Sequence, residues 1–139
     1  MIWIKNKVEQ LTKTYKTNDP FELAAAMNIQ LYQWDLHSEI MGFYKYIRRN
    51  RFIFINSNLV DEDKKFTCSH ELGHAVLHPK VNTPFLRANT FYSIDKIERE
   101  ANEFAVNLLL YDKNLEDYET KFDVLRENGI PYEMERFVN

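Results

Sequence analysis

The sequence predicts an α+β fold in which a small three-stranded antiparallel sheet packs against helices. Apolar residues follow helical spacing at the start of the chain, read as strands over residues 29–55, and return to helical spacing beyond residue 58. This order differs from the regular strand–helix alternation of parallel sheets. A length of 139 residues with 45% hydrophobic residues is typical of one domain with its own core. We therefore expect residues 1–139 to form a single domain.

The composition excludes several classes of protein. With 10 Phe, 8 Tyr and 2 Trp the chain is too apolar to be disordered, and 3 Gly and 4 Pro are too few for low-complexity sequence. A net charge of −3 lacks the basic excess of a nucleic-acid binder. The single cysteine, Cys68, rules out an internal disulfide, and charges interrupt the N-terminus too early for a signal peptide. We expect a cytoplasmic protein that contacts neither membrane nor nucleic acid directly.

Two helices are expected before the sheet. The first carries apolar side chains at helical spacing, at Ile4, Val8, Leu11 and Tyr15. Asp19 is a good N-cap for the second, because its carboxylate can accept hydrogen bonds from the first free backbone N–H groups. Pro20 suits the first helical position, since its missing N–H would have no partner there. This second helix should end near Asn28.

Three segments have the residue types of strands. Residues 29–34, 42–47 and 51–55 are rich in aromatic and β-branched side chains, and residues 48–50 predict the turn between the last two. The strand from Gly42 to Ile47 is also a candidate exposed edge, along which an extended peptide could bind by β-augmentation.

The strongest functional signal is the run His70-Glu71-Leu72-Gly73-His74. Two histidines four residues apart lie one turn apart on the same side of a helix, where both imidazoles can hold one metal ion. Glu71, next to the first histidine, can then act as a general base. The alternative is two ordinary histidines that flank a glutamate by chance.

The context of this motif is helical. Asp61 is a plausible N-cap, and Pro79 should end the helix. Gly73 lowers helix propensity by about 1 kcal/mol relative to Ala, which indicates close packing against another backbone.

The remaining histidines and the cysteine are expected to be structural. His78 is interpreted as a helix C-terminal histidine that interacts favourably with the helix dipole, with a place in the site lining as the alternative. His37 should lie on the surface. Cys68 lies about 200° around the helix from His70, so a buried position away from the metal is expected.

A third metal ligand is expected on the next helix, which Ser93 or Asp95 can cap. Its apolar stripe comprises Ile97, Ala101, Phe104, Ala105 and Leu108. Glu98 falls about 60° from the centre of this stripe and is the carboxylate nearest its buried edge. A salt bridge at the exposed rim is the alternative for Glu98.

The other polar residues of this helix divide into two groups. Asn102 follows Glu98 by one turn, where it could hydrogen-bond a ligand histidine. Glu100 and Glu103 are assigned, with Arg99, to a solvated face.

The end of the chain should be helical as well. From Asn114 onward, acidic residues alternate with Leu115, Tyr118, Phe122 and Leu125 in an amphipathic helical pattern. Residues 129–131 should break this helix before a short segment over 132–138.

Two motifs together resemble the ImmA/IrrE family of zinc metallopeptidases. These are His70-Glu-Leu-Gly-His74-Ala-Val-Leu-His78 and Glu98-Arg-Glu-Ala-Asn102-Glu-Phe-Ala-Val-Asn-Leu-Leu109. The lead-in Ile53-Phe-Ile-Asn56 is also typical of the family, whereas many members carry a proline after the Leu-Leu pair and this chain does not.

The resemblance implies a zincin-like site in which His70, His74 and Glu98 bind Zn²⁺ and Glu71 is the catalytic base. Short members in prophages and other mobile elements relieve repression by cleaving a helix-turn-helix repressor. The resemblance therefore implies a zinc metalloendopeptidase whose partner is such a repressor.

Two other functions remain open at this point. One is a non-catalytic antirepressor that sequesters the repressor and keeps zinc for structure. Glu71 favours the enzyme, because a structural site needs no base beside its ligand. The other is a zinc enzyme that acts on a small amide, which the lack of a long insertion for a substrate pocket disfavours.

Overall fold

The structure is a computed structural model that describes residues 1–82, 84–86 and 95–139. Within these residues the helices are α1 (Ile2–Tyr15), α2 (Pro20–Ala26), α3 (Asp61–Leu77), α5 (Lys96–Leu109) and α6 (Lys121–Glu127). The strands are β1 (Gln30–Trp34), β2 (Ile40–Ile47), β3 (Asn50–Asn56) and β4 (Pro84–Leu86). Two short 3₁₀ helices, η1 (Leu115–Asp117) and η2 (Tyr132–Phe137), flank α6. The α+β prediction is confirmed.

The sheet differs from the predicted three antiparallel strands. Among the described residues it has four strands in the order β1-β3-β2-β4, and it is mixed because β1 runs parallel to β3. A short connection leaves β1 antiparallel to β2, but β3 folds back from β2 and inserts between them. It therefore runs antiparallel to β2 and parallel to β1. The pattern of apolar residues predicts which face of a strand is buried, not which neighbour the strand takes.

The expectation of a free edge along residues 42–47 is wrong. β2 pairs with β3 on one side and with β4 on the other, where Gly42 faces Phe85 and Phe43 faces Pro84. Further along, the backbone N–H of Tyr46 donates to the side-chain oxygen of Asn82 at 2.8 Å. The chain itself thus already occupies this edge of β2 at Gly42 and Phe43 and the backbone N–H of Tyr46.

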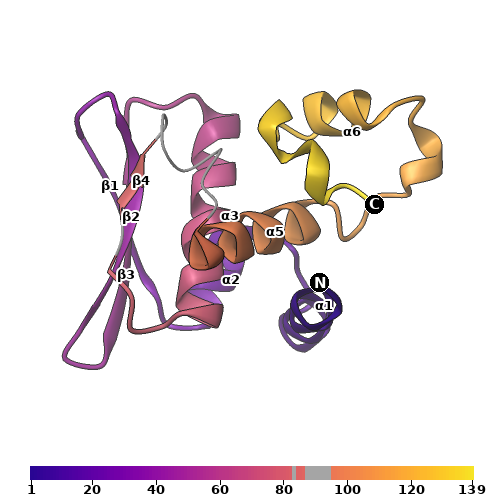
Figure 1. Ribbon diagram of the computed structural model, residues 1–139. Helices are drawn as coiled ribbons and strands as arrows, with labels where there is room; N and C mark the ends of the chain where they lie inside the picture. The colour runs from indigo at the N-terminus through magenta and orange to yellow at the C-terminus, as the bar shows by residue number, and fades with distance from the viewer. Residues whose placement is uncertain (83, 87–94) are drawn as a thin grey trace.

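The elements form layers with α3 at the centre. Figure 1 shows the sheet on one side of α3, and α5 crosses its other side with α1 and the C-terminal helices beyond. α3 contacts β2, β3 and α5. Fully buried side chains fill both interfaces: Tyr44, Ile53 and Ile55 from the sheet, Phe66 and Leu72 from α3, and Phe104 and Leu108 from α5. No helix of the described residues is long and apolar enough to cross a membrane.

The expected start of α2 is confirmed and that of α3 is shifted by one residue. The carboxylate of Asp19 accepts hydrogen bonds from the N–H groups of Phe21 at 2.8 Å and Glu22 at 3.4 Å. In α3 the N-cap is Val60, whose backbone is extended, and Asp61 is the first helical residue. Asp61 therefore interacts with the positive end of the helix dipole rather than capping it.

The predicted C-terminal helix from Asn114 divides into η1 and α6. Thr120 is the reason, because its hydroxyl accepts a hydrogen bond from the N–H of Asp123 at 3.1 Å and starts a new helix there. Phe122, assigned to the apolar face, is 53% exposed as a result. The left-handed backbone of Gly129 follows the end of α6, and η2 occupies the predicted final segment.

Gly73 lets α5 approach α3 closely. A Cβ atom at this position would lie 3.2 Å from the Cα and the carbonyl oxygen of Ala101 and 3.2 Å from the Cβ of Phe104. Two of these atoms belong to the backbone of α5, which cannot turn away as a flexible side chain can. The glycine thus sets the separation of the two helices, as its cost in helix propensity predicted.

Replacing Gly73 with Val should lower the free energy of unfolding by about 1–3 kcal/mol, because the added methyl groups overpack the contact with α5. Urea unfolding followed by circular dichroism measures the change. Ala25→Val, at an exposed position of α2, is the control and should change the free energy by less than about 0.7 kcal/mol. A Gly73→Val protein as stable as the parent would show that α5 can move away from α3 without loss.

Candidate metal centre

The two histidines of the motif face α5 from the middle of α3. His70 is 0% and His74 is 1% exposed, and their ring centroids lie 4.8 Å apart with the rings nearly perpendicular. The i, i+4 spacing places both rings on one side of the helix, and the contact at Gly73 brings α5 against that side. Both imidazole rings are therefore buried against α5.

Glu98, in the first turn of α5, lies between the two rings. One carboxylate oxygen is 3.2 Å from Nε2 of His70 and the other is 2.9 Å from Nε2 of His74. The side chain is buried, so it does not form the salt bridge at an exposed rim that was the alternative. Burial alone would raise the pKa of Glu98, but contacts with His70 and His74 outweigh it and lower that pKa. The group is therefore a carboxylate.

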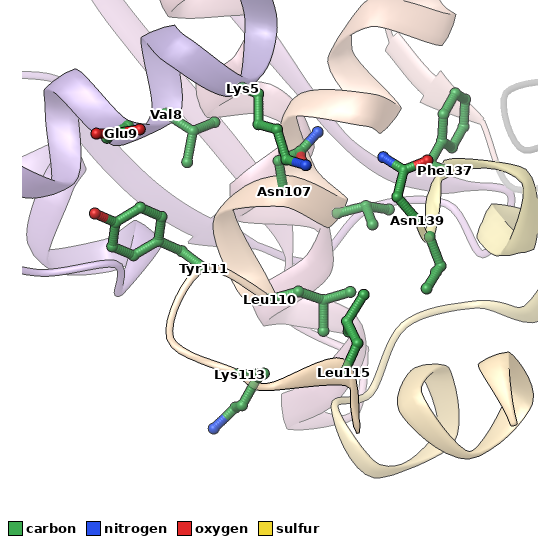
Figure 2. Close-up of a pocket in the computed structure, with 12 residues that line it drawn as sticks. Lys5, Val8, Glu9, Asn107, Leu110, Tyr111, Lys113, Leu115, Phe137 and Asn139 are labelled. Atoms are coloured by element: carbon green, nitrogen blue, oxygen red, sulfur yellow. The ribbon is translucent and has the colours of Figure 1, made fainter. Parts of the chain in front are cut away.

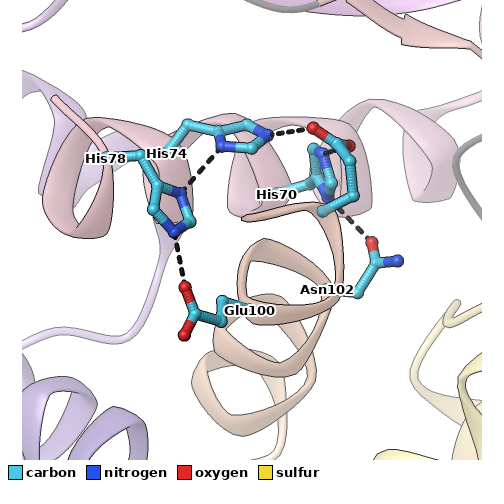
Figure 3. Close-up of polar contacts among 6 residues, drawn as sticks. His70, His74, His78, Glu100 and Asn102 are labelled. Carbon is cyan, nitrogen blue, oxygen red and sulfur yellow. Dashed lines mark hydrogen bonds and ion pairs between the residues drawn. The ribbon is translucent and has the colours of Figure 1, made fainter. Parts of the chain in front are cut away.

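Asn102 determines which nitrogen of His70 carries the proton. The side-chain oxygen of Asn102, which can only accept, lies 2.8 Å from Nδ1 of His70, as Figure 3 shows. Nδ1 must therefore be the donor of this hydrogen bond, which leaves Nε2 as the ring nitrogen that faces Glu98. This is the hydrogen bond that the helix geometry predicted for Asn102.

The polar atoms of this cluster fit a bound cation. Nε2 of His70 and an oxygen of Glu98 lie 3.2 Å apart, close enough to bind one cation together. His74 Nε2 and the other oxygen of Glu98 are close, yet they are not aligned for a hydrogen bond within the described residues. Imidazole nitrogens and carboxylate oxygens are common metal ligands in proteins, and here two imidazoles and one carboxylate converge on one space. The residues present could hold a metal ion.

Glu71 adds a second buried carboxyl group to this space. Its side chain is 0% exposed, and neither oxygen has a hydrogen-bond partner among the residues that the structure describes. One oxygen lies within 4.8 Å of a ring nitrogen of both His70 and His74. Burial, together with the nearby charge of Glu98, raises the pKa of Glu71 well above its usual value. A buried group that lacks hydrogen bonds is costly, which favours a functional reason for it.

His78 and Glu100 lie beside the cluster. His78 is the C-cap of α3, as predicted, whereas Glu100 is buried and not solvated. Nδ1 of His78 is 3.1 Å from Nδ1 of His74, and Nε2 of His78 is 2.8 Å from an oxygen of Glu100. His78 therefore ends the helix and also lines the site. Burial lowers the pKa values of both His74 and His78, which favours neutral imidazoles.

The solvated face assigned to Glu100 and Glu103 is wrong. Glu100 is 6% exposed, and Glu103 is half-buried with its carboxylate against the amino group of Met1. An apolar stripe marks only the part of a helix that meets apolar partners, whereas α5 also packs against the polar residues of α3. The signal for Glu100 was the third histidine of the series, His78, which needed a partner.

The other candidate residues lie outside the cluster. Tyr44 donates its hydroxyl to the carbonyl oxygen of Pro79, and burial raises its pKa to about 12. Cys68 is buried and His37 is exposed, as predicted. Burial also raises the pKa of the Cys68 thiol well above its usual value. Tyr92 and Ser93 lie outside the described residues.

A separate hollow of about 310 Å³ lies between α1, the C-terminal half of α5 and the end of the chain. Figure 2 shows Lys5 and Glu9 on one side and Leu110 and Phe137 on the other. None of the residues that line it belongs to the histidine cluster, so the hollow contributes nothing to the candidate centre.

Comparison with known proteins identifies the family to which the chain belongs. The model of the M78 peptidase family, described as the IrrE N-terminal-like domain, matches residues 24–137. An uncharacterized immunity region protein 2 of Bacillus phage phi105 is 53% identical over 135 residues, which cover 94% of this chain and 85% of the relative. Metallopeptidase ImmA of Bacillus subtilis (strain 168) is 35% identical over 117 residues, which cover 82% of this chain and 67% of the relative. The chain therefore belongs to the ImmA/IrrE family of metallopeptidases.

Proposed function

We propose that this protein is a zinc-dependent metalloendopeptidase that cleaves a helix-turn-helix repressor of a phage or mobile element. The observation that carries the proposal is the buried space between α3 and α5. There, Nε2 of His70, Nε2 of His74 and the carboxylate of Glu98 converge beside the unpartnered carboxyl group of Glu71. The first three would hold the ion, and Glu71 would be the catalytic base.

In amide hydrolysis, His70, His74 and Glu98 would hold the ion, and Glu71 would transfer the proton. When bound, zinc would polarise the scissile carbonyl group and lower the pKa of a water molecule. Glu71 accepts a proton from the attacking water, whose oxygen bonds to the carbonyl carbon. As the C–N bond breaks, Glu71 passes that proton to the leaving nitrogen, which restores the carboxylate. Its position suits this role, because one of its oxygens lies within 4.8 Å of a ring nitrogen of each histidine, beside the place where the ion would be held.

The substrate class rests on the relatives and on charge. One relative is named as an immunity region protein of a phage and the other as a metallopeptidase. The repressor that keeps the element silent would be a nearby protein substrate for a peptidase encoded in such a region. The net charge of −3 gives no electrostatic attraction to DNA, which supports action on the repressor itself in the cytoplasm.

Glu71 also separates cleavage from simple sequestration of the repressor. A structural zinc site is closed by four protein ligands, whereas a catalytic site has three and an open position. Here two histidines and Glu98 would supply three ligands. Glu71 lies beside them, with one oxygen within 4.8 Å of one ring nitrogen of His70 and one of His74. This arrangement favours the enzyme over a binding protein with a structural metal.

Removing one ligand should abolish metal binding. The parent protein, purified without chelator, should hold about one zinc ion per chain, and His74→Ala and Glu98→Ala should each lose most of it. Inductively coupled plasma mass spectrometry measures the content. His37→Ala is the control, because that histidine is exposed and should leave the metal in place. Full retention of zinc by His74→Ala would show that the ligands are assigned wrongly.

Replacing the base should stop cleavage while binding persists. Glu71→Gln keeps the size of the side chain but cannot accept the proton, so cleavage should fall by at least about 10²-fold. The assay follows loss of a full-length, epitope-tagged candidate helix-turn-helix repressor, together with a reporter gene under its control. Zinc content and repressor binding should stay at the parent level.

Glu62→Gln, an exposed substitution in the same helix, is the matched control for this assay and should cleave like the parent. If Glu71→Gln relieves repression as well as the parent does, cleavage is not the mechanism. Sequestration of the repressor would then be the function.

A further inference from the structure

We propose that Glu100 and His78 are positioning residues that hold His74 in the one tautomer able to bind the metal. The proposal rests on the proposed metal site and adds residues that do not touch the ion. Figure 3 shows the chain of contacts from Glu100 on α5 through His78 to His74 on α3.

The contact with Glu100 determines which ring nitrogen of His78 carries the proton. A carboxylate can only accept, so the 2.8 Å contact requires that Nε2 of His78 carries the hydrogen. A neutral imidazole has one N–H group, which leaves Nδ1 of His78 as an acceptor. The 3.1 Å contact between the two Nδ1 atoms then requires that His74 donates. The proton of His74 is thus placed on Nδ1.

The same assignment follows from the metal end. A histidine that binds a metal through Nε2 keeps its hydrogen on Nδ1, and that hydrogen needs an acceptor outside the site. For His74 the acceptor is Nδ1 of His78, and the remaining N–H of His78 finds its acceptor in Glu100. The contact with Glu100 and the binding of the metal therefore both require the same positions of the protons on His78 and His74.

His70 is held in the same tautomer by a different group. Asn102, also on α5, accepts from Nδ1 of His70 at 2.8 Å. α5 therefore supplies the third ligand, Glu98, and also the residues that orient both histidines. A salt bridge that only stabilised the fold would not need to match the tautomer of a ligand at both ends.

The test is the affinity of the protein for zinc, measured by competition with a chromophoric chelator. Glu100→Gln keeps the shape but offers both a donor and an acceptor to His78, so it no longer sets the proton. His78→Leu removes the acceptor for His74 altogether. Each should weaken zinc binding by about 10- to 100-fold, the usual effect of changing a partner of a metal ligand.

Two further variants distinguish positioning from mere packing. His78→Asn should recover most of the affinity that His78→Leu loses, because the amide oxygen can take the place of Nδ1 and accept from His74. Glu103→Gln is the control on the same helix, since Glu103 contacts the N-terminal amino group and not the cluster. It should bind zinc like the parent.

The tautomer can also be observed directly. Imidazole ¹⁵N spectra of the metal-free parent should place the proton of His74 on Nδ1, and Glu100→Gln should show a second population with the proton on Nε2. Circular dichroism checks that each variant is folded, and if Glu100→Gln unfolds, the comparison of His78→Leu with His78→Asn still decides.

The outcomes separate this proposal from the proposed function. If the parent binds zinc, and folded Glu100→Gln and His78→Leu bind it as tightly, the positioning role is wrong and the metal site stands. If His78→Asn is as weak as His78→Leu, the residues act through packing and not through the acceptor. If the parent binds no zinc, both the metal site and the positioning role are wrong.

Discussion

The approach of α5 to α3 at Gly73 decides whether the polar residues of the two helices can meet. Neither helix alone holds all three candidate ligands, since the histidines lie on α3 and Glu98 lies on α5. The side chains of Glu98 and Asn102 reach the imidazoles because the backbone of Ala101 lies against the glycine. Each added methylene at that contact would separate the helices and lengthen every contact of the cluster at once. The candidate metal centre therefore depends on a contact point at which α3 presents no side chain.

The buried cluster contains carboxylate oxygens that have no hydrogen-bond donor among the described residues. Glu71 and Glu98 place two carboxyl groups beside two imidazoles, and neither oxygen of Glu71 is satisfied within the part of the chain that the structure describes. A core made only for stability would replace such groups by apolar side chains of similar volume. A cation at this point would satisfy the lone pairs of His70, His74 and Glu98 together. A bound cation would thus serve the proposed reaction and would also satisfy the buried polar groups of the site.

Local patterns predicted the features that one segment determines by itself. The helix cap of Asp19, the α+β order and the buried position of Cys68 follow from short-range sequence, and the structure agrees with them. Helical angles also placed Glu98 on the buried side of α5, beside the two histidines; the roles of these residues stay predictions. Features that depend on neighbours were missed. The parallel partner of β1 depends on where β3 inserts, and the burial of Glu100 depends on His78, a residue of another helix.

The distribution of the cluster over two helices has a thermodynamic consequence. Residues 70–78 and residues 98–102 come together only when the chain is folded, so the unfolded chain cannot hold an ion in the same way. Any ion that binds there shifts the folding equilibrium by mass action, by about 2.7 kcal/mol when its free concentration is 100 times the dissociation constant. Depletion of the ion would raise the population of open states that cellular proteases degrade. The abundance of this protein would then follow the supply of its metal, in addition to the activity that the metal provides.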